Sequence, residues 1–160
     1  MNIIVGFSTS KAWYSRLICW ATKSKVSHTF LLVKMMGELL VFQEGPLGYG
    51  AKNFETFKKE NQIVDLIVPK VPISLGFMKS LCQLGMPYGY LALIGIAFVM
   101  IGRSLGWHML NPFRGIRAPF CSARNTLILQ DSKYPGAEKL DAYSTSPEDL
   151  LEFMRKTEFG

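Results

Sequence analysis

Two apolar stretches separated by a glycine constrain the fold of this chain more than any other feature. They read HTFLLVKM and ELLVFQE, with Gly37 between them. Branched and aromatic residues dominate both stretches, as they do in β-strands, and a glycine at this spacing is typical of a hairpin turn. The pattern therefore predicts an antiparallel β-hairpin. Two shorter stretches, NIIVGF before it and QIVDLIV after it, predict further strands.

The length of the hairpin loop decides which side chain lies beside His28. We expect a three-residue loop, residues 35–37, because it opposes chemically matched side chains: Lys34 with Glu38, Leu32 with Leu40, and Phe30 with Phe42. In this register His28 faces Glu44, whose carboxylate could orient and charge-stabilise the imidazole. A two-residue loop would instead oppose His28 to Gly45 and make Gln43 its side-chain neighbour.

The second half of the chain carries helical patterns. Three stretches have helical spacing of their apolar residues: ISLGFMKSLCQL, YLALIGIAFVMIG and STSPEDLLEFMRK. In the last of these, Ser146 is expected as the N-cap, Pro147 as the first helical residue and Asp149 as the partner in a variant capping box. A further helix is expected to begin at about Ser10. With 160 residues and no linker or repeat, the chain is predicted to form a single α+β domain over residues 1–160.

The apolar run Leu91–Ile101 raises the question of a membrane segment. It has only 11 residues without a polar side chain, against the roughly 20 that a spanning helix needs. We therefore expect a buried core helix. A membrane-surface role stays open, because the segment that follows contains aromatic and basic residues typical of an interface: Trp107, Phe113, Arg103, Arg114 and Arg117.

The positive charge of the chain is concentrated in one segment. The net charge is +6, and no acidic residue lies between Asp65 and Asp131, where the basic residues are Lys70, Lys79, Arg103, Arg114, Arg117 and Arg124. If these residues share a face, they favour an anionic partner such as a phospholipid surface or a cell-wall polymer. Specific nucleic-acid binding is not expected, because interleaved base-stacking aromatics are missing. The alternative is that the cations merely solvate a hydrophobic middle of the chain.

The N-terminus and the cysteines limit the cellular setting. The N-terminal residues MNIIVGFSTSKAWYSRL lack the basic start and the small-residue cleavage site of a signal peptide, so we expect the protein to stay where it is made. Three widely spaced cysteines fit neither a disulfide framework nor a zinc pattern. Neither a metal nor a cofactor is therefore expected. Cys19 and Cys82 are interpreted as small buried hydrophobic residues.

Cys121 differs from the other two cysteines in its context. It stands where the loop APF meets the apolar helical pattern CSARNTLIL. A thiol in the first turn of a helix lies near the positive end of the helix dipole, and the backbone at Cys121 and Ser122 offers an oxyanion site. With His28 and an orienting Glu44, Cys121 would complete the minimal set for acyl transfer through a thioester.

Five motifs in order resemble one known group of enzymes. They are VSHTFLLV, VFQEGPLGYG, GMPYGYLALIG, FCSARNTLIL and SPEDLLEF, which together span nearly the whole chain. They look like the motifs of circularly permuted papain-like cysteine hydrolases related to the NlpC peptidases, a group that includes YiiX-like and lecithin:retinol acyltransferase-like enzymes, many from tailed phages. The order of histidine before cysteine is the most specific part of the resemblance. It implies a permuted papain-like fold with Cys121 as nucleophile, His28 as base, Glu44 as orienting residue and Tyr88 lining the site.

The chain departs from that family pattern at two places. Gly89 stands where members often carry an aspartate between two tyrosines, and Ala123, followed by Arg124, stands where they often carry a glutamate. Both departures bear on substrate and activity and leave the three implied catalytic residues in place.

The resemblance implies three classes of function. The first is a thiol hydrolase that cleaves an amide bond, foremost in peptidoglycan stem peptides. The second is a lipid-directed thiol acyltransferase or esterase, with an acyl lipid as substrate. The third is a catalytically inactive virion or assembly protein that binds other virion proteins. The expected location is the host cytoplasm or a phage virion, with peripheral membrane association left open.

Overall fold

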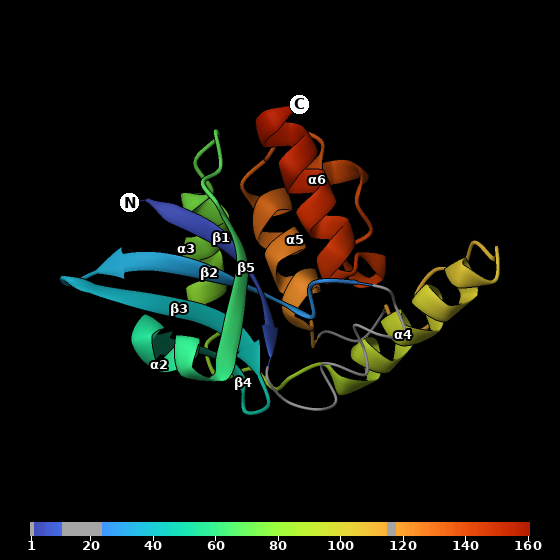
Figure 1. Cartoon of the computed structure of the whole chain (residues 1–160), viewed down its shortest axis with the longest axis horizontal. Helices are drawn as coiled ribbons and strands as arrows, with labels where there is room; N and C mark the ends of the chain where they lie inside the picture. Colours follow the sequence, from blue (N-terminus) through green and yellow to red (C-terminus); the bar gives the residue numbers. More distant parts are fainter. Residues whose placement is uncertain (1, 11–23, 115–117) are drawn as a thin grey trace.

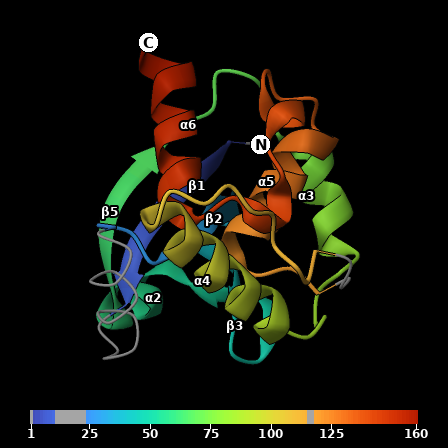
Figure 2. The ribbon, with the colours of Figure 1, turned by 90° about the vertical axis from the view of Figure 1, so that its right-hand side faces the viewer.

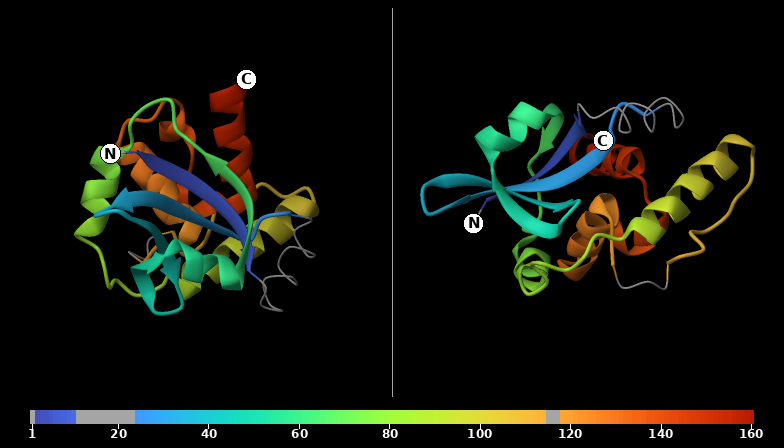
Figure 3. Two further views of the ribbon diagram at one scale, coloured as in Figure 1. Left: turned by 60° about the vertical axis from the view of Figure 1, so that its left-hand side comes forward. Right: turned by 90° about the horizontal axis from the view of Figure 1, so that it is seen from below.

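The computed structural model describes residues 2–10, 24–114 and 118–160. The helix expected from about Ser10, together with Cys19 and Arg117, lies outside the described residues. A five-stranded antiparallel sheet forms the centre of the structure (Figure 1). Helix α2 covers one face of this sheet, and α3 and α5 cover the other, as the view from below shows (Figure 3). The α+β class predicted from the sequence is confirmed.

The strand order is β4-β3-β2-β1-β5, and each neighbouring pair is antiparallel. The predicted hairpin forms β2 and β3, and the two shorter apolar stretches form β1 and β5. β4 was not predicted, because GYGAKN has little apolar content. The strand bounds are β1 Ile3–Ser10, β2 His28–Met35, β3 Glu38–Gly45, β4 Gly48–Asn53 and β5 Asn61–Ile67.

The helices begin where the sequence provides caps or loop ends. The Asn53 side chain caps α2 by accepting hydrogen bonds from two backbone N–H groups. The capping box of α6 is confirmed, because the Ser146 hydroxyl accepts from the Asp149 N–H and the Asp149 carboxylate accepts from the Ser146 N–H. The bounds are α2 Phe54–Glu60, α3 Ser74–Leu81, α4 Tyr90–Ser104, α5 Cys121–Asp131 and α6 Pro147–Phe159, with short 3₁₀ turns at Ala137–Lys139 and Ala142–Ser144.

The hairpin register differs from the expected one by one residue. Met35 pairs with Glu38, so the loop has only two residues, and Met36 and Gly37 both have positive φ values of 51° and 84°. Such a turn matches the twist of the two strands, which outweighs the side-chain pairings on which the three-residue loop was predicted. Because a one-residue slip reverses the face of every side chain on one strand relative to the other, the predicted opposition of His28 to Glu44 is wrong.

Each face of the sheet has its own apolar packing. On the α5 side the largest core cluster joins the sheet to α3, α5 and α6. On the α2 side a smaller cluster consists of Phe30, Leu32, Val41 and Phe57. Adjacent residues of a strand therefore contact different layers, and this alternation determines the surroundings of each candidate site residue.

Helix α4 is only half buried, so the expectation of a core helix was only partly right. Ala92, Ile96 and Val99 are buried, but large apolar side chains on the opposite side are exposed. The helix extends away from the rest of the molecule (Figure 1) and lies in front of it in the view turned by 90° (Figure 2). Within the described ranges, no helix is both long enough and apolar enough to span a bilayer.

Candidate functional site

Cys121 is the first residue of α5, as the sequence predicts. The preceding residue, Phe120, is the N-cap and provides no side-chain hydrogen bond to the first turn. The side chain of Cys121 is buried, with 3% of its surface exposed. Its thiol lies within hydrogen-bonding reach of the backbone and the hydroxyl of Thr29 in β2. The start of α5 is thus held against the start of β2.

Burial controls the protonation of this thiol. It raises the pKa of Cys121 above its ordinary value, and the negative charge of Glu44 acts in the same direction. Hydrogen bonds from Thr29 and from the Ser122 backbone favour the thiolate and oppose this rise only in part. In the arrangement that the structure shows, Cys121 is therefore a neutral thiol at neutral pH.

His28 lies beside Gln43 and not beside Glu44. Its Nε2 atom is 2.7 Å from Gln43 Oε1. The ring also lies 6.2 Å, centroid to centroid, from the ring of Phe57 in α2. Burial lowers the pKa of His28 to about 4, although the hydrogen bond to Gln43 opposes this shift. The alternative in which Gln43 is the neighbour of His28 is confirmed.

The side chains of His28 and Cys121 lie on different faces of the sheet. His28 points to the α2 layer with Phe57, whereas the next residue, Thr29, points to α5 and accepts a 2.9 Å hydrogen bond from Asn125. The thiol contacts that same Thr29. The structure therefore brings the backbone at His28 close to Cys121 without placing the imidazole against the sulfur.

Glu44 lies on the α5 side, where it pairs with Arg124. The Arg124 Nε and Nη2 atoms are each 2.7 Å from Glu44 Oε1, and both side chains are almost fully buried. Burial raises the pKa of Glu44 to about 7, although the Arg124 charge favours the carboxylate. Arg124 also donates to Gln83 and stacks 4.6 Å from the centroid of the Tyr49 ring. Glu44 thus neutralises a buried arginine and does not orient His28.

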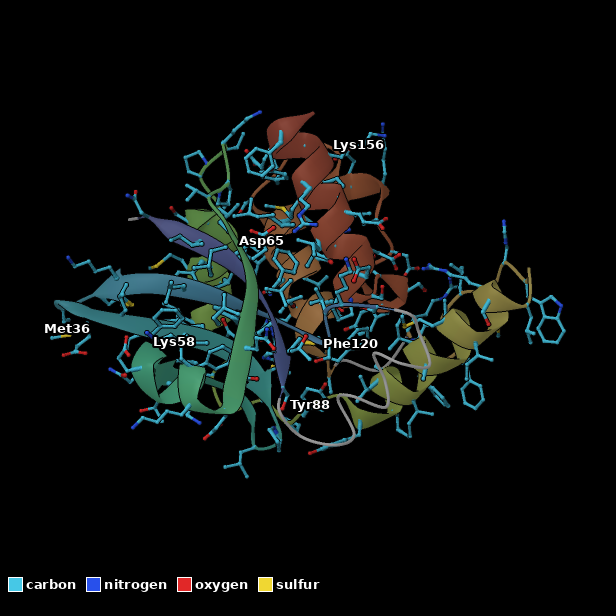
Figure 4. All side chains as sticks on the ribbon, in the orientation of Figure 1. Met36, Lys58, Asp65, Tyr88, Phe120 and Lys156 are labelled. Atoms are coloured by element: carbon cyan, nitrogen blue, oxygen red, sulfur yellow. The ribbon has the colours of Figure 1, made fainter. Side chains whose placement is uncertain are left out.

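A pocket of about 570 Å³ opens at the end of the sheet where β2 begins and β3 ends. Tyr88 lines it together with polar residues and the first turn of α4, and Tyr88 also packs near Phe120 (Figure 4). The lining residues are Ser10, Ser27, His28, Gln43, Glu44, Gly45, Pro46, Glu60, Asn61, Tyr88, Tyr90 and Leu93. Cys121 is not among these lining residues, and the Ser122 hydroxyl donates to the Thr145 carbonyl at 2.8 Å. The imidazole therefore borders the pocket and the thiol does not.

Several polar residues around the thiol were missed from the sequence. Thr29 and Asn125 hold the start of α5 to the sheet, and the Arg124–Glu44 pair is buried beside them. A buried arginine requires a carboxylate partner, but the burial of Arg124 is known only from the structure. For Thr29 and Asn125 no pattern in the sequence distinguishes them from surface residues.

The structure also bears on Cys82 and on the basic segment. Cys82 is exposed, so its interpretation as a buried residue was wrong. Three basic residues of the positive segment are in ion pairs: Lys79 with Asp131, Arg103 with Asp149 and Arg124 with Glu44. Each of these three cations therefore has a carboxylate beside it.

No part of the described chain gathers three His, Cys, Asp or Glu side chains in the way that a metal site requires. Comparison with known proteins gave no match to a protein family and none to a curated protein sequence.

Proposed function

We propose that this chain is a thiol-dependent hydrolase that cleaves an amide bond in peptidoglycan stem peptides, with Cys121 as nucleophile and His28 as base. One observation carries the proposal: the Cys121 thiol, at the first residue of α5, contacts Thr29, the residue next to His28. The resemblance of the ordered motifs to permuted papain-like hydrolases provides the substrate class.

The reaction would follow the usual course of thiol acyl transfer. The imidazole takes the thiol proton, and the sulfur attacks the amide carbonyl carbon to form a C–S bond. The C–N bond then breaks as the imidazolium gives its proton to the leaving amine. Water hydrolyses the thioester, which releases the acid and restores the thiol.

This course requires His28 to leave Gln43. Because the backbone fixes the side chain of a strand residue on one face of the sheet, this step requires a change of the backbone at His28, the first residue of β2. A protonated imidazole beside the sulfur would also counteract the burial that now keeps the thiol neutral. The proposal therefore includes a rearrangement of both the backbone and the side chain at His28 when substrate binds.

The start of α5 supports a role in stabilising an oxyanion. The N-cap residue Phe120 offers no side-chain acceptor to the first-turn N–H groups. These groups, together with the helix dipole, favour a negative oxygen at this end of the helix. A carbonyl oxygen of the substrate placed here would gain charge as the sulfur attacks.

A substrate screen with matched cysteine variants tests the proposal. Purified protein is incubated with a mixture of muropeptides and, separately, with acyl phospholipids, and the products are identified by mass spectrometry. We expect muropeptide hydrolysis by the unaltered protein and by Cys82→Ala, and none by Cys121→Ala. Hydrolysis that survives in Cys121→Ala would overturn the role of the thiol, and turnover of acyl lipids alone would replace the substrate class.

A second candidate is a protein that retains this fold without catalysis. Its support is specific: His28 and Cys121 are both in their neutral forms and point to different faces of the sheet. In that case neither substrate class would be turned over, and Cys121→Ala would leave binding to other virion proteins unchanged.

A further inference from the structure

The outer side of α4 presents a continuous apolar surface, which we call the α4 apolar face. Its helical members are spaced three and four residues apart, so they lie on one side of the helix. Each member is at least 40% exposed. The members are Leu91, Ile94, Phe98, Ile101 and Leu105 from α4 and its C-cap, with Trp107, Met109 and Leu110 from the loop that follows.

The loop after α4 packs against the inner side of the helix, at the buried residues Ala92 and Gly95. The Asn111 side chain donates to the Ala92 carbonyl at 2.8 Å and to the Tyr143 carbonyl at 2.6 Å. A side chain on Gly95 would collide with it, because an added Cβ would lie 1.8 Å from Asn111 Oδ1. The loop therefore returns along α4, and its exposed apolar side chains Trp107, Met109 and Leu110 lie next to the helix.

No charge interrupts the α4 apolar face. Arg103 is the only charged residue of α4, and its guanidinium turns away to Asp149, with Nη1 2.7 Å from Oδ2. Exposed apolar patches of this extent mark interaction sites in water-soluble proteins. Because the face has no charged or amide side chain at its centre, it offers nothing that would fix the register of a protein partner.

The geometry points to a membrane-surface partner: we propose that the α4 apolar face docks on an anionic phospholipid bilayer, with the helix lying in the plane of the interface. The 15 residues of α4, at about 1.5 Å each, fall well short of the roughly 30 Å hydrocarbon core. Trp107, which is 64% exposed, is the side-chain type preferred at the headgroup level. The helix projects from the molecule, so the body would not obstruct contact with a flat surface (Figures 1 and 3).

Charge near the face selects an anionic bilayer. No acidic residue occurs between Asp65 and Asp131 in the sequence, so the helix and its loop carry no carboxylate of their own, and Asp149, which contacts α4, is paired with Arg103. In the segment that follows α4, Arg114 is exposed and takes part in none of the ion pairs among the described residues. Binding is independent of the hydrolase proposal, because it concerns this face alone.

Co-sedimentation with vesicles tests the inference on the full chain. The probes are vesicles of phosphatidylcholine with 30% phosphatidylglycerol, and vesicles of phosphatidylcholine alone. We expect the unaltered protein to bind the anionic vesicles and to bind the neutral ones at least several-fold more weakly. Phe98→Glu and Ile101→Glu should each weaken binding by about tenfold or more, because each places a charge in the apolar contact.

Met36→Glu is the control, since it introduces the same charge at an apolar residue of the hairpin turn, which is more exposed than Phe98 or Ile101. It should bind as the unaltered protein does, and thermal unfolding checks that all variants fold. The inference is overturned if the unaltered protein binds neither vesicle, or if Phe98→Glu binds as well as Met36→Glu. It is also overturned if sedimentation velocity shows a dimer that Phe98→Glu dissociates, because a second copy of the chain would then occupy the face.

Discussion

Replacing Arg124 with methionine tests the buried ion pair with Glu44. The two side chains are 4% and 0% exposed, so the variant leaves the Glu44 carboxyl group in a buried site without its cation. Removing one partner of such a pair commonly lowers the free energy of unfolding by about 3–5 kcal/mol. Arg124 also favours the ionised form of Glu44. Its loss should therefore raise the Glu44 pKa beyond the present value of about 7.

The pKa of Glu44 determines how this loss depends on pH. In the folded protein burial raises the pKa from 4.5 to about 7, so the folded state binds the proton more tightly than the unfolded state. The contribution of protonated Glu44 to the free energy of unfolding is therefore fully present below about pH 4.5, and it decreases as the pH rises toward 7. In Arg124→Met the free energy of unfolding continues to decrease above pH 7. It falls by about 1.4 kcal/mol per pH unit until the pH passes the new pKa of Glu44.

Urea unfolding followed by circular dichroism at pH 5.5, 7.0 and 8.5 measures this difference. We expect the free energy of unfolding of Arg124→Met to fall further below that of the unaltered protein as the pH rises from 7.0 to 8.5. The double variant Arg124→Met/Glu44→Gln lacks the titrating carboxyl group. Its difference in free energy of unfolding from the unaltered protein should therefore not grow between pH 7.0 and 8.5. A difference that stays constant from pH 5.5 to 8.5, or the same widening in the double variant, would refute the role assigned to the pair.

Three further predictions follow from single sites. Iodoacetamide should modify exposed Cys82 about tenfold or more faster than Cys121, because the Cys121 thiol is buried and has a raised pKa. Peptide mapping measures both rates, and labelling of Cys121 first would contradict this expectation. Met36→Asn should raise the free energy of unfolding by about 0.5–1 kcal/mol, because asparagine tolerates the positive φ of the turn better than methionine does. A lower free energy of unfolding, measured with urea, would contradict this. Gly95→Ala should lower the free energy of unfolding by about 1–3 kcal/mol through its clash with Asn111, whereas Gly50→Ala, with open space around it, should change it by less than about 0.5 kcal/mol.

The local parts of the fold could be predicted from the sequence. The hairpin strands and the capping box of α6 rest on neighbouring residues, so short patterns were sufficient. Cys121 at the start of α5 likewise follows from a loop that meets an apolar helical pattern. The fourth strand was missed, because pairing along β3 compensates for its weak local preference.

The arrangement of the candidate site depends on tertiary structure and was predicted less well. Two loop lengths were compatible with the hairpin sequence, and the choice between them decides whether Gln43 or Glu44 accompanies His28. The partner of Arg124 is 80 residues away in the sequence. No short pattern could have identified Glu44 as that partner without the register.

Detection of an acyl-enzyme on Cys121 tests the hydrolase proposal most directly. The protein is mixed with a muropeptide substrate, quenched in acid after a short interval to preserve thioesters, and digested for peptide mapping by mass spectrometry. We expect an acyl adduct on the peptide that contains Cys121, a loss of that adduct in Cys121→Ala, and a strong reduction in His28→Ala with Cys82→Ala unchanged. Muropeptide cleavage without any adduct on Cys121, or an adduct on Cys82 instead, would contradict the proposed chemistry.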